Sequence, residues 1–428
     1  MSKLSWLTPF SRVLLLSLTA FAVSAPAAAQ EVLEGTIRVG VVLPQTSQDD
    51  PLAAAVIDAA TQGLVMAEEE FAFNAELFGV GFELITAEAP EGTAAEAAQG
   101  LIDEGAFAVI GGFGLEDATA LSAWAEESGV PFLNVGASSD SLRNDLCAPT
   151  TFHVAPSAAM YLDAMAGWYV RAGFRQWYVV QANDPESAAQ RERLQWTLDE
   201  RFFGARVIGE ALVEPGAGLD EATIADIGNS GADLVLLLLD TEDQLTALAA
   251  LEAAGTSAMV GGFPHEETQT RAFFSTLYET APTLNARFRA SAWEATLDAY
   301  GARELNARFR QRWETPMEPS AWAAFQAVKI LYEAAFFGGA TDLDTVVAYI
   351  ENPQTVFDTW KGIGTTFRPW DRQLRQPVYL IEVNGEAADP FNLALLVGEL
   401  PAIYLPGTDP VERLDQLGDL EGRSTCGR

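Results

Sequence analysis

Short apolar segments alternate with amphipathic segments along most of the chain after residue 36. Each apolar segment is followed by a turn and then by apolar positions at helical spacing, which is the pattern of a strand leading into a helix. Asp50-Pro51 and Asp184-Pro185 each supply a helix N-cap and a first-turn proline after a predicted strand. The predicted strands cover residues 37–43, 80–86, 107–110 and 131–135 in a first run, and 177–181, 206–213, 234–239 and 258–261 in a second run.

The predicted strands are almost continuously apolar, as expected for parallel sheets that are covered by helices on both faces. Strands that alternate with helices predict an α/β architecture. The two runs are separated by residues 140–175, and a chain of this length usually forms more than one core. The sequence therefore predicts two α/β lobes.

The last third of the chain has a different pattern. Residues 294–350 are predicted to be mostly helical, and they include the apolar segment 319–337. Residues 365–383 are predicted to form a hairpin, with a polar turn between two strands. The remaining residues, 384–428, are less regular and contain several prolines, so they are expected to form a tail.

The first residues have the features of a secretory signal peptide. Lys3 and Arg12 precede an apolar run over residues 13–23, and the pair Ala27 and Ala29 suits cleavage before Gln30. The run is too short for an ordinary transmembrane helix, although an uncleaved anchor is the alternative. We therefore expect residues 1–29 to be removed on export.

The formal net charge is −35, and the acidic residues are dispersed along the chain. Such a charge argues against binding to nucleic acid, whose phosphates require Lys and Arg, and against anionic membrane surfaces. It is consistent with a well-solvated surface on an exported protein. Scattered carboxylates without a ligand cluster predict no metal site.

The chain contains two cysteines, Cys147 and Cys426. In an oxidising compartment a single pair of cysteines is expected to form a disulfide, which would tie the tail to the first third of the chain. The alternative is two unpaired thiols.

The sequence does not predict an enzyme. It contains no nucleophile-elbow, zinc-protease or P-loop motif, and the glycines at 111–114 do not have dinucleotide-binding spacing, so no cofactor is expected. Of the two histidines, His153 lies on a strand that is expected to end at a crossing between the lobes. His265 stands beside Glu266 and Glu267, and one such neighbour pair is weak evidence for general base catalysis.

Six segments, in this order and spacing, carry a resemblance to a known family. They are IRVGVVLP (37–44), AVIGGFG (108–114), VPFLNVGASSDSL (130–142), FHVAPSAAM (152–160), SAWAAFQAVKILYEA (320–334) and QPVYLIEVNGE (376–386). In these segments the chain resembles the type I periplasmic binding proteins of the Leu/Ile/Val class, which serve ABC transporters.

Three further segments are more distinctive. They are TLDAYGARELNARF (296–309), FRPWDRQLRQP (367–377) and RSTC (423–426). They resemble the subgroup associated with PQQ-dependent alcohol dehydrogenase systems, a name that describes a genetic association and not a bound quinone.

The resemblance implies a two-lobed Venus-flytrap fold whose lobes are joined by three crossings, near residues 153–155, 291–293 and 365–370. Lobe 1 would comprise residues 36–153 and 293–364, lobe 2 would comprise residues 154–292 and 365–385, and the tail would comprise residues 386–428. The implied protein is a periplasmic monomer that binds a small organic ligand and delivers it to an ABC permease in the inner membrane. The alternative is a ligand-binding sensor or a protein-interaction module on the same fold, without a transporter.

Ligands of open α/β sheets bind beyond the carboxyl ends of the strands, where helix N-termini offer free N–H groups. Two predicted lobe 1 loops lie there, at residues 112–116 and 136–139, and the resemblance implies that they hold an anionic end of the ligand. On lobe 2 the predicted contributors are Asp240 and the segments 263–267 and 183–186.

The family's ligand-binding positions transfer only in part. Ser138 and Gly136 match the family's hydroxyl-bearing loop, whereas Leu115, next to Gly114, stands where the family has a serine. On lobe 2, Asp240 stands where an aromatic residue is common. Phe263 stands at an acidic position, with Glu266 close by. Phe113 and Trp293 are candidate cleft aromatics, or else packing residues.

Overall fold

The computed structural model describes residues 35–47, 50–402 and 406–426. The predicted signal peptide, residues 1–29, lies outside the described part. In the part that is described, every helix is too short or too polar to cross a bilayer.

Five parallel strands form the first sheet, in the order β2-β1-β3-β4-β5. We call this sheet and the helices that pack on it lobe 1. Its strands are β1 (Thr36–Pro44), β2 (Gly81–Ala89), β3 (Ala108–Gly111), β4 (Phe132–Asn134) and β5 (Thr151–His153). Its helices are α1 (Pro51–Glu76), α2 (Ala94–Asp103), α3 (Leu115–Ser128), the 3₁₀ helix η1 (Asp140–Arg143), α9 (Ala302–Trp313), α10 (Pro319–Gly338) and α11 (Leu343–Glu351).

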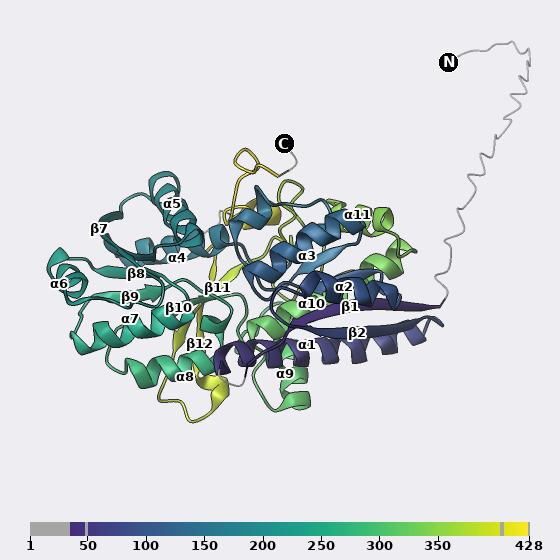
Figure 1. Ribbon diagram of the computed structural model, residues 1–428, viewed down its shortest axis with the longest axis horizontal. Helices are drawn as coiled ribbons and strands as arrows, with labels where there is room; N and C mark the ends of the chain where they lie inside the picture. Colours follow the sequence, from purple (N-terminus) through teal and green to yellow (C-terminus); the bar gives the residue numbers. More distant parts are fainter. Residues whose placement is uncertain (1–34, 48–49, 403–405, 427–428) are drawn as a thin grey trace, which may run out of the picture. The chain divides into compact units, whose positions relative to one another are not determined.

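The core of lobe 1 is built around the contact between α1 and α10, two helices far apart in the sequence (Figure 1). Almost the whole of α10 up to Ala335 is buried, because the helix packs against the sheet and against α1, which also contacts the sheet. The two helices approach most closely at Gly63, where a Cβ atom would lie 2.1 Å from the carbonyl oxygen of Ala321. Only a glycine allows this approach.

Four parallel strands form the second sheet, in the order β7-β6-β8-β9. Its strands are β6 (Gln176–Ala182), β7 (Arg206–Val213), β8 (Leu234–Leu238) and β9 (Met259–Gly262). Its helices are α4 (Ala158–Ala172), α5 (Pro185–Glu200), α6 (Glu221–Ser230), α7 (Thr241–Ala253), the 3₁₀ helix η2 (Glu267–Gln269) and α8 (Arg271–Thr280). All five residues of β8 are buried, as expected for a strand covered on both faces.

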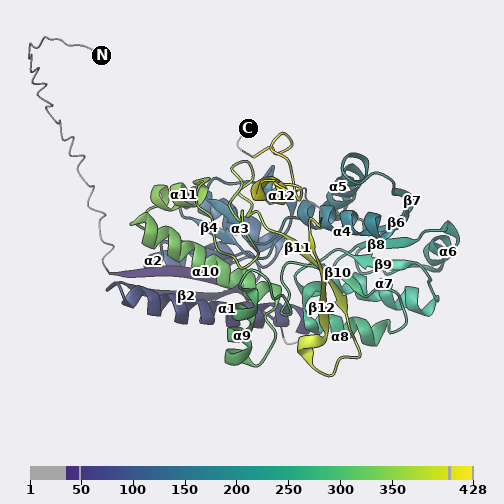
Figure 2. The same ribbon diagram turned by 180° about the vertical axis from the view of Figure 1, so that it is seen from behind.

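A third, antiparallel sheet in the order β10-β11-β12 packs onto these elements and completes lobe 2 (Figures 1 and 2). It consists of β10 (Phe288–Ser291), β11 (Val378–Val383) and β12 (Ala394–Leu400). The 3₁₀ helix η3 (Pro390–Asn392) lies between β11 and β12, and α12 (Pro410–Leu414) follows β12. The chain passes between the lobes after β5, after β10 and before β11.

The predicted hairpin over residues 365–383 is wrong. Only an isolated bridge joins Phe367 to Leu374, and β11 pairs instead with β10 and with β12, which lies in the segment predicted to be an irregular tail. The polar residues between the two expected strands are not a solvated turn. Arg368, Asp371 and Gln373 are buried and hydrogen-bonded, so this segment is held by side chains and not by a ladder.

Candidate functional site

A cavity of about 190 Å³ lies between the two lobes, beyond the carboxyl ends of strands from both parallel sheets. Lobe 1 contributes the loop after β3 and the loop after β4, while lobe 2 contributes α4, the first turns of α5 and the segment after β9. The lining residues are Phe113, Gly114, Leu115, Gly136, Ala137, Ser138, Ser139, Tyr161, Glu186, Gln190, Pro264, His265, Glu266, Glu267 and Gln269.

Asn134, at the end of β4, shapes both lobe 1 loops. Its buried Oδ1 accepts hydrogen bonds from the backbone N–H groups of Gly136 (3.2 Å) and Ala137 (3.1 Å), and its Nδ2 donates to the Ala137 carbonyl (2.8 Å). In the neighbouring loop Gly112 has a φ of +82°, and a Cβ there would lie 2.8 Å from the same Oδ1. Gly114 is the N-cap of α3 and has no side chain that could cap the helix, so the first N–H groups of α3 have no side-chain partner where Gly114 and Leu115 line the cavity.

Glu266 reaches from lobe 2 to the lobe 1 loop. Its two carboxylate oxygens would lie 2.4 and 2.5 Å from a Cβ on Gly136, so the carboxylate lies directly against that glycine. Its Oε2 is shielded from solvent and has no hydrogen-bond partner. Burial, and then the neighbouring charge of Glu267, raise the pKa of Glu266 well above its ordinary value. A positive group placed in the cavity would offset the free-energy cost of burying the ionised Glu266 carboxylate.

Two more carboxylates line the cavity. Ser139 Oγ donates to Glu186 Oε2 across the lobes (2.7 Å), and Thr241 Oγ1 donates to Glu267 Oε2 (3.1 Å). No arginine or lysine is among the lining residues. His265 Nε2 lies 2.9 Å from the carbonyl oxygen of Leu239, a contact that requires the ring to donate from this nitrogen. The cavity therefore presents acidic side chains and no basic side chain to whatever enters it.

Contacts between the lobes hold the cavity closed. Besides the Ser139–Glu186 hydrogen bond, Arg271 at the start of α8 pairs with Glu318 at the start of α10 (2.9 Å) and with Glu294 (2.7 Å). Arg271 and Glu294 are buried, so this pair is shielded from salt. These interactions describe a closed arrangement of the two lobes around the cavity.

The structure places six of the predicted ligand-binding residues on the cavity wall, and the other three elsewhere. The six are Phe113, Gly114, Leu115, Gly136, Ser138 and Glu266. Asp240 caps α7 by accepting a hydrogen bond from the Asp243 N–H (2.8 Å). Phe263 is fully buried with its ring edge-on to Tyr161, and Trp293 is stacked on Trp322 with ring centroids 5.8 Å apart. These three residues therefore have structural roles.

The sequence patterns missed three lining residues, Tyr161, Gln190 and Gln269. Tyr161 and Gln190 project from the first turns of α4 and α5, and Gln269 lies in η2. Gln269 Nε2 donates to Tyr161 Oη (3.1 Å), and its Oε1 accepts from the Ala292 N–H (2.7 Å). Of the three, only Gln190 carried a signal, because it lies within two turns of the helix start predicted at Asp184-Pro185.

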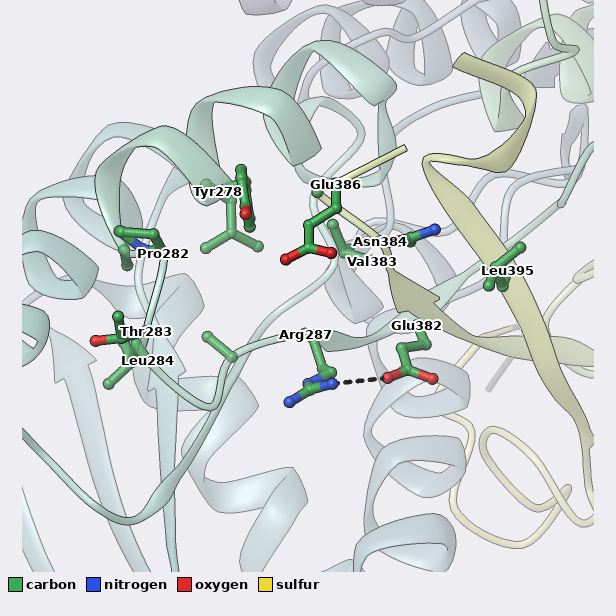
Figure 3. A pocket seen from close by; sticks show the side chains of 14 residues that line it. Tyr278, Pro282, Thr283, Leu284, Arg287, Glu382, Val383, Asn384, Glu386 and Leu395 are labelled. Atoms are coloured by element: carbon green, nitrogen blue, oxygen red, sulfur yellow. Dashed lines mark hydrogen bonds and ion pairs between the residues drawn. The ribbon is translucent and has the colours of Figure 1, made fainter. Parts of the chain in front are cut away.

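A larger pocket, of about 480 Å³, lies within lobe 2, between the end of α8 and the adjoining ends of β10 and β11 (Figure 3). Its arginine, Arg287, is already paired with Glu382 at 3.2 Å, and both side chains reach solvent. It contains no buried unpaired group, so the cavity between the lobes is the better candidate site. Within the described ranges, no group of three or more His, Cys, Asp or Glu side chains is placed to hold a metal ion.

Cys147 and Cys426 are joined in a disulfide, with their Cα atoms 5.5 Å apart. Cys147 lies in the loop between β4 and β5 of lobe 1, a few residues beyond the cavity loop 136–139.

Several solved structures share this fold. A periplasmic binding protein from Burkholderia mallei superposes with a TM-score of 0.72 at 19% identity, covering 92% of this chain and 98% of that one. A leucine-, isoleucine-, valine-, threonine- and alanine-binding protein from Brucella ovis, in its closed conformation, gives 0.71 at 17% identity, covering 82% and 91%. A solute-binding protein from R. palustris in complex with benzoate gives 0.65 at 18% identity, covering 85% and 96%.

The sequence itself was also compared with known families. No curated protein sequence matches the chain. A family profile described as periplasmic binding protein matches residues 36–388, which is most of the chain. The structural likenesses, at these low identities, show the same two-lobed fold. The chain therefore belongs to the periplasmic binding protein family.

Proposed function

We propose that this chain is a periplasmic solute-binding protein that captures a small organic ligand between its lobes and delivers it, as a monomer, to an ABC permease in the inner membrane. The observation that carries the proposal is the cavity between the lobes, with Glu266 on its wall and the Oε2 atom of that carboxylate shielded from solvent and unpaired. The names of the structural relatives support a transport role, since they include branched-chain amino acid transporter components. We further propose lobe boundaries at 36–153 with 293–364, and 154–292 with 365–385.

The ligand in this proposal carries an ammonium group. Glu266, Glu267 and Glu186 surround the cavity without a lysine or arginine, so a ligand with only a carboxylate would meet net repulsion. An ammonium group beside Glu266 would form a charge-assisted hydrogen bond in a shielded place. The free N–H groups at the start of α3 and the Ser138 hydroxyl can donate hydrogen bonds to a carboxylate or hydroxyl oxygen at the other end of the ligand. Amino-acid-like and amino-alcohol ligands fit this description.

Ligand binding would stabilise the closed arrangement of the lobes because it removes the cost of burying Glu266. A ligand shifts the equilibrium between open and closed forms by its difference in affinity for the two. The closed form would then be the one that the permease recognises. The segments that resemble the alcohol-dehydrogenase-associated subgroup, 296–309 and 367–377, favour a ligand from alcohol metabolism.

The proposal predicts which compounds raise the melting temperature of the mature protein. In a panel of amino acids, amines, amino alcohols, alcohols and carboxylic acids, we expect stabilisation only by compounds with an ammonium group. Glu266→Gln should weaken binding of the best compound about tenfold to a hundredfold, since a charge-assisted hydrogen bond is lost. Glu242→Gln, an exposed change on α7 outside the cavity, is the matched control.

A second variant tests the lobe 1 loops. Ser138→Ala combined with Gly114→Val should also weaken binding, and the fold should tolerate it because a Cβ on Gly114 meets nothing within 4 Å. Stabilisation by simple carboxylates that survives Glu266→Gln would contradict the assignment of the ligand's charge. Stabilisation that is unaffected by either variant would place the ligand elsewhere.

The raised pKa of Glu266 predicts that Glu266→Gln, which should weaken ligand binding, makes the ligand-free protein more stable. An unfolded glutamate titrates near pH 4, so the ligand-free wild type loses stability as the pH rises from about 4 through the raised pKa of Glu266. Glu266→Gln has no such loss and should be the more stable protein at pH 7. Urea denaturation of both proteins at pH 4 and pH 7 measures this, and a less stable variant at pH 7 would show that Glu266 is already compensated.

A further inference from the structure

The end of the chain forms a strap that connects the lobes outside the part that matches the family. The family profile ends at residue 388, whereas the strap, residues 415–426, follows α12. It starts in the core of lobe 2, where Leu417 packs with Leu400 of β12 and with residues of α4. It ends at the disulfide to Cys147 in lobe 1. Figure 1 shows this last part of the chain between α5 and the lobe 1 helices α3 and α11.

The lobe 2 end of the strap is held at Gly418 by buried charges. The Gly418 N–H donates to Asp163 Oδ2 of α4 (2.9 Å), and the Gly418 carbonyl accepts from Arg201 (2.8 Å). Asp163 is fully buried and also pairs with Arg193 of α5 at 2.7 Å. Charge-assisted bonds of this kind, away from solvent, are strong, so this end of the strap is fixed to lobe 2.

The middle of the strap lies on the third crossing between the lobes. Arg368 donates to the Leu417 carbonyl (3.0 Å), and Trp370 Nε1 donates to the Asp419 carbonyl (3.1 Å). In return, Ser424 Oγ donates to the Trp370 carbonyl (2.6 Å). The strap and the crossing segment therefore each donate hydrogen bonds to the other.

The lobe 1 end of the strap is bonded to the loop that follows the cavity. The Thr425 N–H donates to Asn144 Oδ1 (3.1 Å), beside the Cys147–Cys426 disulfide. Asn144 directly follows Arg143, whose buried guanidinium donates to the carbonyl oxygens of Ala137 (3.1 Å) and Ser139 (2.8 Å) in the cavity wall. The strap is therefore connected to the cavity wall through Asn144, which binds Thr425, and through Arg143, which binds the cavity loop.

We propose that the strap is a fourth connection between the lobes, closed by a covalent bond, and that it limits how far they open. The inference rests on the proposed function in one respect, because limiting the opening slows exchange of a ligand held between the lobes. In this proposal, opening moves the Asn144–Cys147 loop of lobe 1 away from α4 and α5 of lobe 2. Because the segment from Gly418 to Cys426 is short and bonded at both ends, that movement breaks the contacts of Gly418 or is stopped by the disulfide. The free energy of the open form relative to the closed form is therefore higher than it would be without the strap.

Two variants of the mature, full-length chain test the strap without any ligand. Cys147→Ser combined with Cys426→Ser removes the covalent closure. Insertion of Gly-Gly-Ser between Glu421 and Gly422 keeps the disulfide and lengthens the strap. Small-angle X-ray scattering reports how far the lobes open, and hydrogen exchange of segments 136–139 and 365–375 reports loosening of the cavity wall and of the third crossing. We expect both variants to increase the radius of gyration and to exchange about tenfold faster at these segments.

The lengthened variant is the matched control for stability. A disulfide that acts only on the unfolded chain would still act after the insertion, since lengthening a loop has little effect on its closure entropy. If the insertion variant has the same radius of gyration and the same hydrogen-exchange rates as the wild type, the strap does not limit opening, whatever the result for the serine variant. Because no ligand is present, this outcome is separate from failure of the ligand panel, which would overturn the proposed function.

Discussion

Gly63→Ala is expected to destabilise the protein by about 2–3 kcal/mol, a large effect for one methyl group. The added Cβ would lie 2.1 Å from the Ala321 carbonyl oxygen and within 3 Å of two more backbone atoms of α10. Backbone atoms cannot rotate away as a side chain can, so α1 and α10 must separate along a contact that organises the lobe 1 core. Overpacking of this kind forces a helix shift and opens voids beside it.

Gly100→Ala is the matched control, because it is the same change inside another helix. A Cβ on Gly100 in α2 meets nothing within 4 Å, so alanine should raise stability by about 0.5–1 kcal/mol through its better helix propensity. Urea denaturation of both variants compares them directly. Equal effects of the two substitutions would show that the α1–α10 contact relaxes without cost.

The parts of the fold that the sequence predicted correctly are those specified by local hydrophobic pattern. The apolar run at 234–239 and the first-turn prolines Pro51 and Pro185 predicted β8, α1 and α5, because burial on both faces and helix start signals are local properties. The segment 367–377 was misassigned because its fold depends on partners far away in sequence. Arg368 bonds to the strap, and Gln373 Oε1 accepts from Arg143, which no local pattern shows.

The parts of the candidate site that are formed by backbone loops were predictable from the sequence. Residues that reach the cavity only if their side chains point toward it were not. The loops at 112–116 and 136–139 follow from the ends of β3 and β4, and Gly114 and Ser138 of these loops line the cavity. Phe263 directly precedes the lining residue Pro264, and Trp293 lies at a predicted crossing between the lobes, but both side chains are buried in the core. The carboxylate on the cavity wall belongs to Glu266, three residues after Phe263, because the segment after β9 continues before it turns into η2.

Asp163→Ala is the substitution with the largest expected effect, because it removes the acceptor that several buried donors share. Asp163 accepts from Arg193 (2.7 Å) and Arg201 (2.7 Å), and also from Thr197 Oγ1 (2.8 Å) and the Gly418 N–H (2.9 Å). Burying two guanidinium groups is tolerable only while a carboxylate compensates them. Losing the carboxylate that both arginines share should cost about 3–5 kcal/mol, more than a neutral hydrogen bond could explain.

The free energy of unfolding of Asp163→Ala, measured with urea, should be compared with that of Asp298→Ala. Asp298 pairs with Arg303 at 3.2 Å where both side chains are more than two thirds exposed, so its loss should cost at most about 1 kcal/mol. Arg193 also lies 3.3 Å from Asp419 of the strap. A loss for Asp163→Ala as small as that for Asp298→Ala would therefore mean that the strap alone holds the arginines. In the expected case the buried carboxylate on α4 fixes both arginines, and the strap is held to lobe 2 through them.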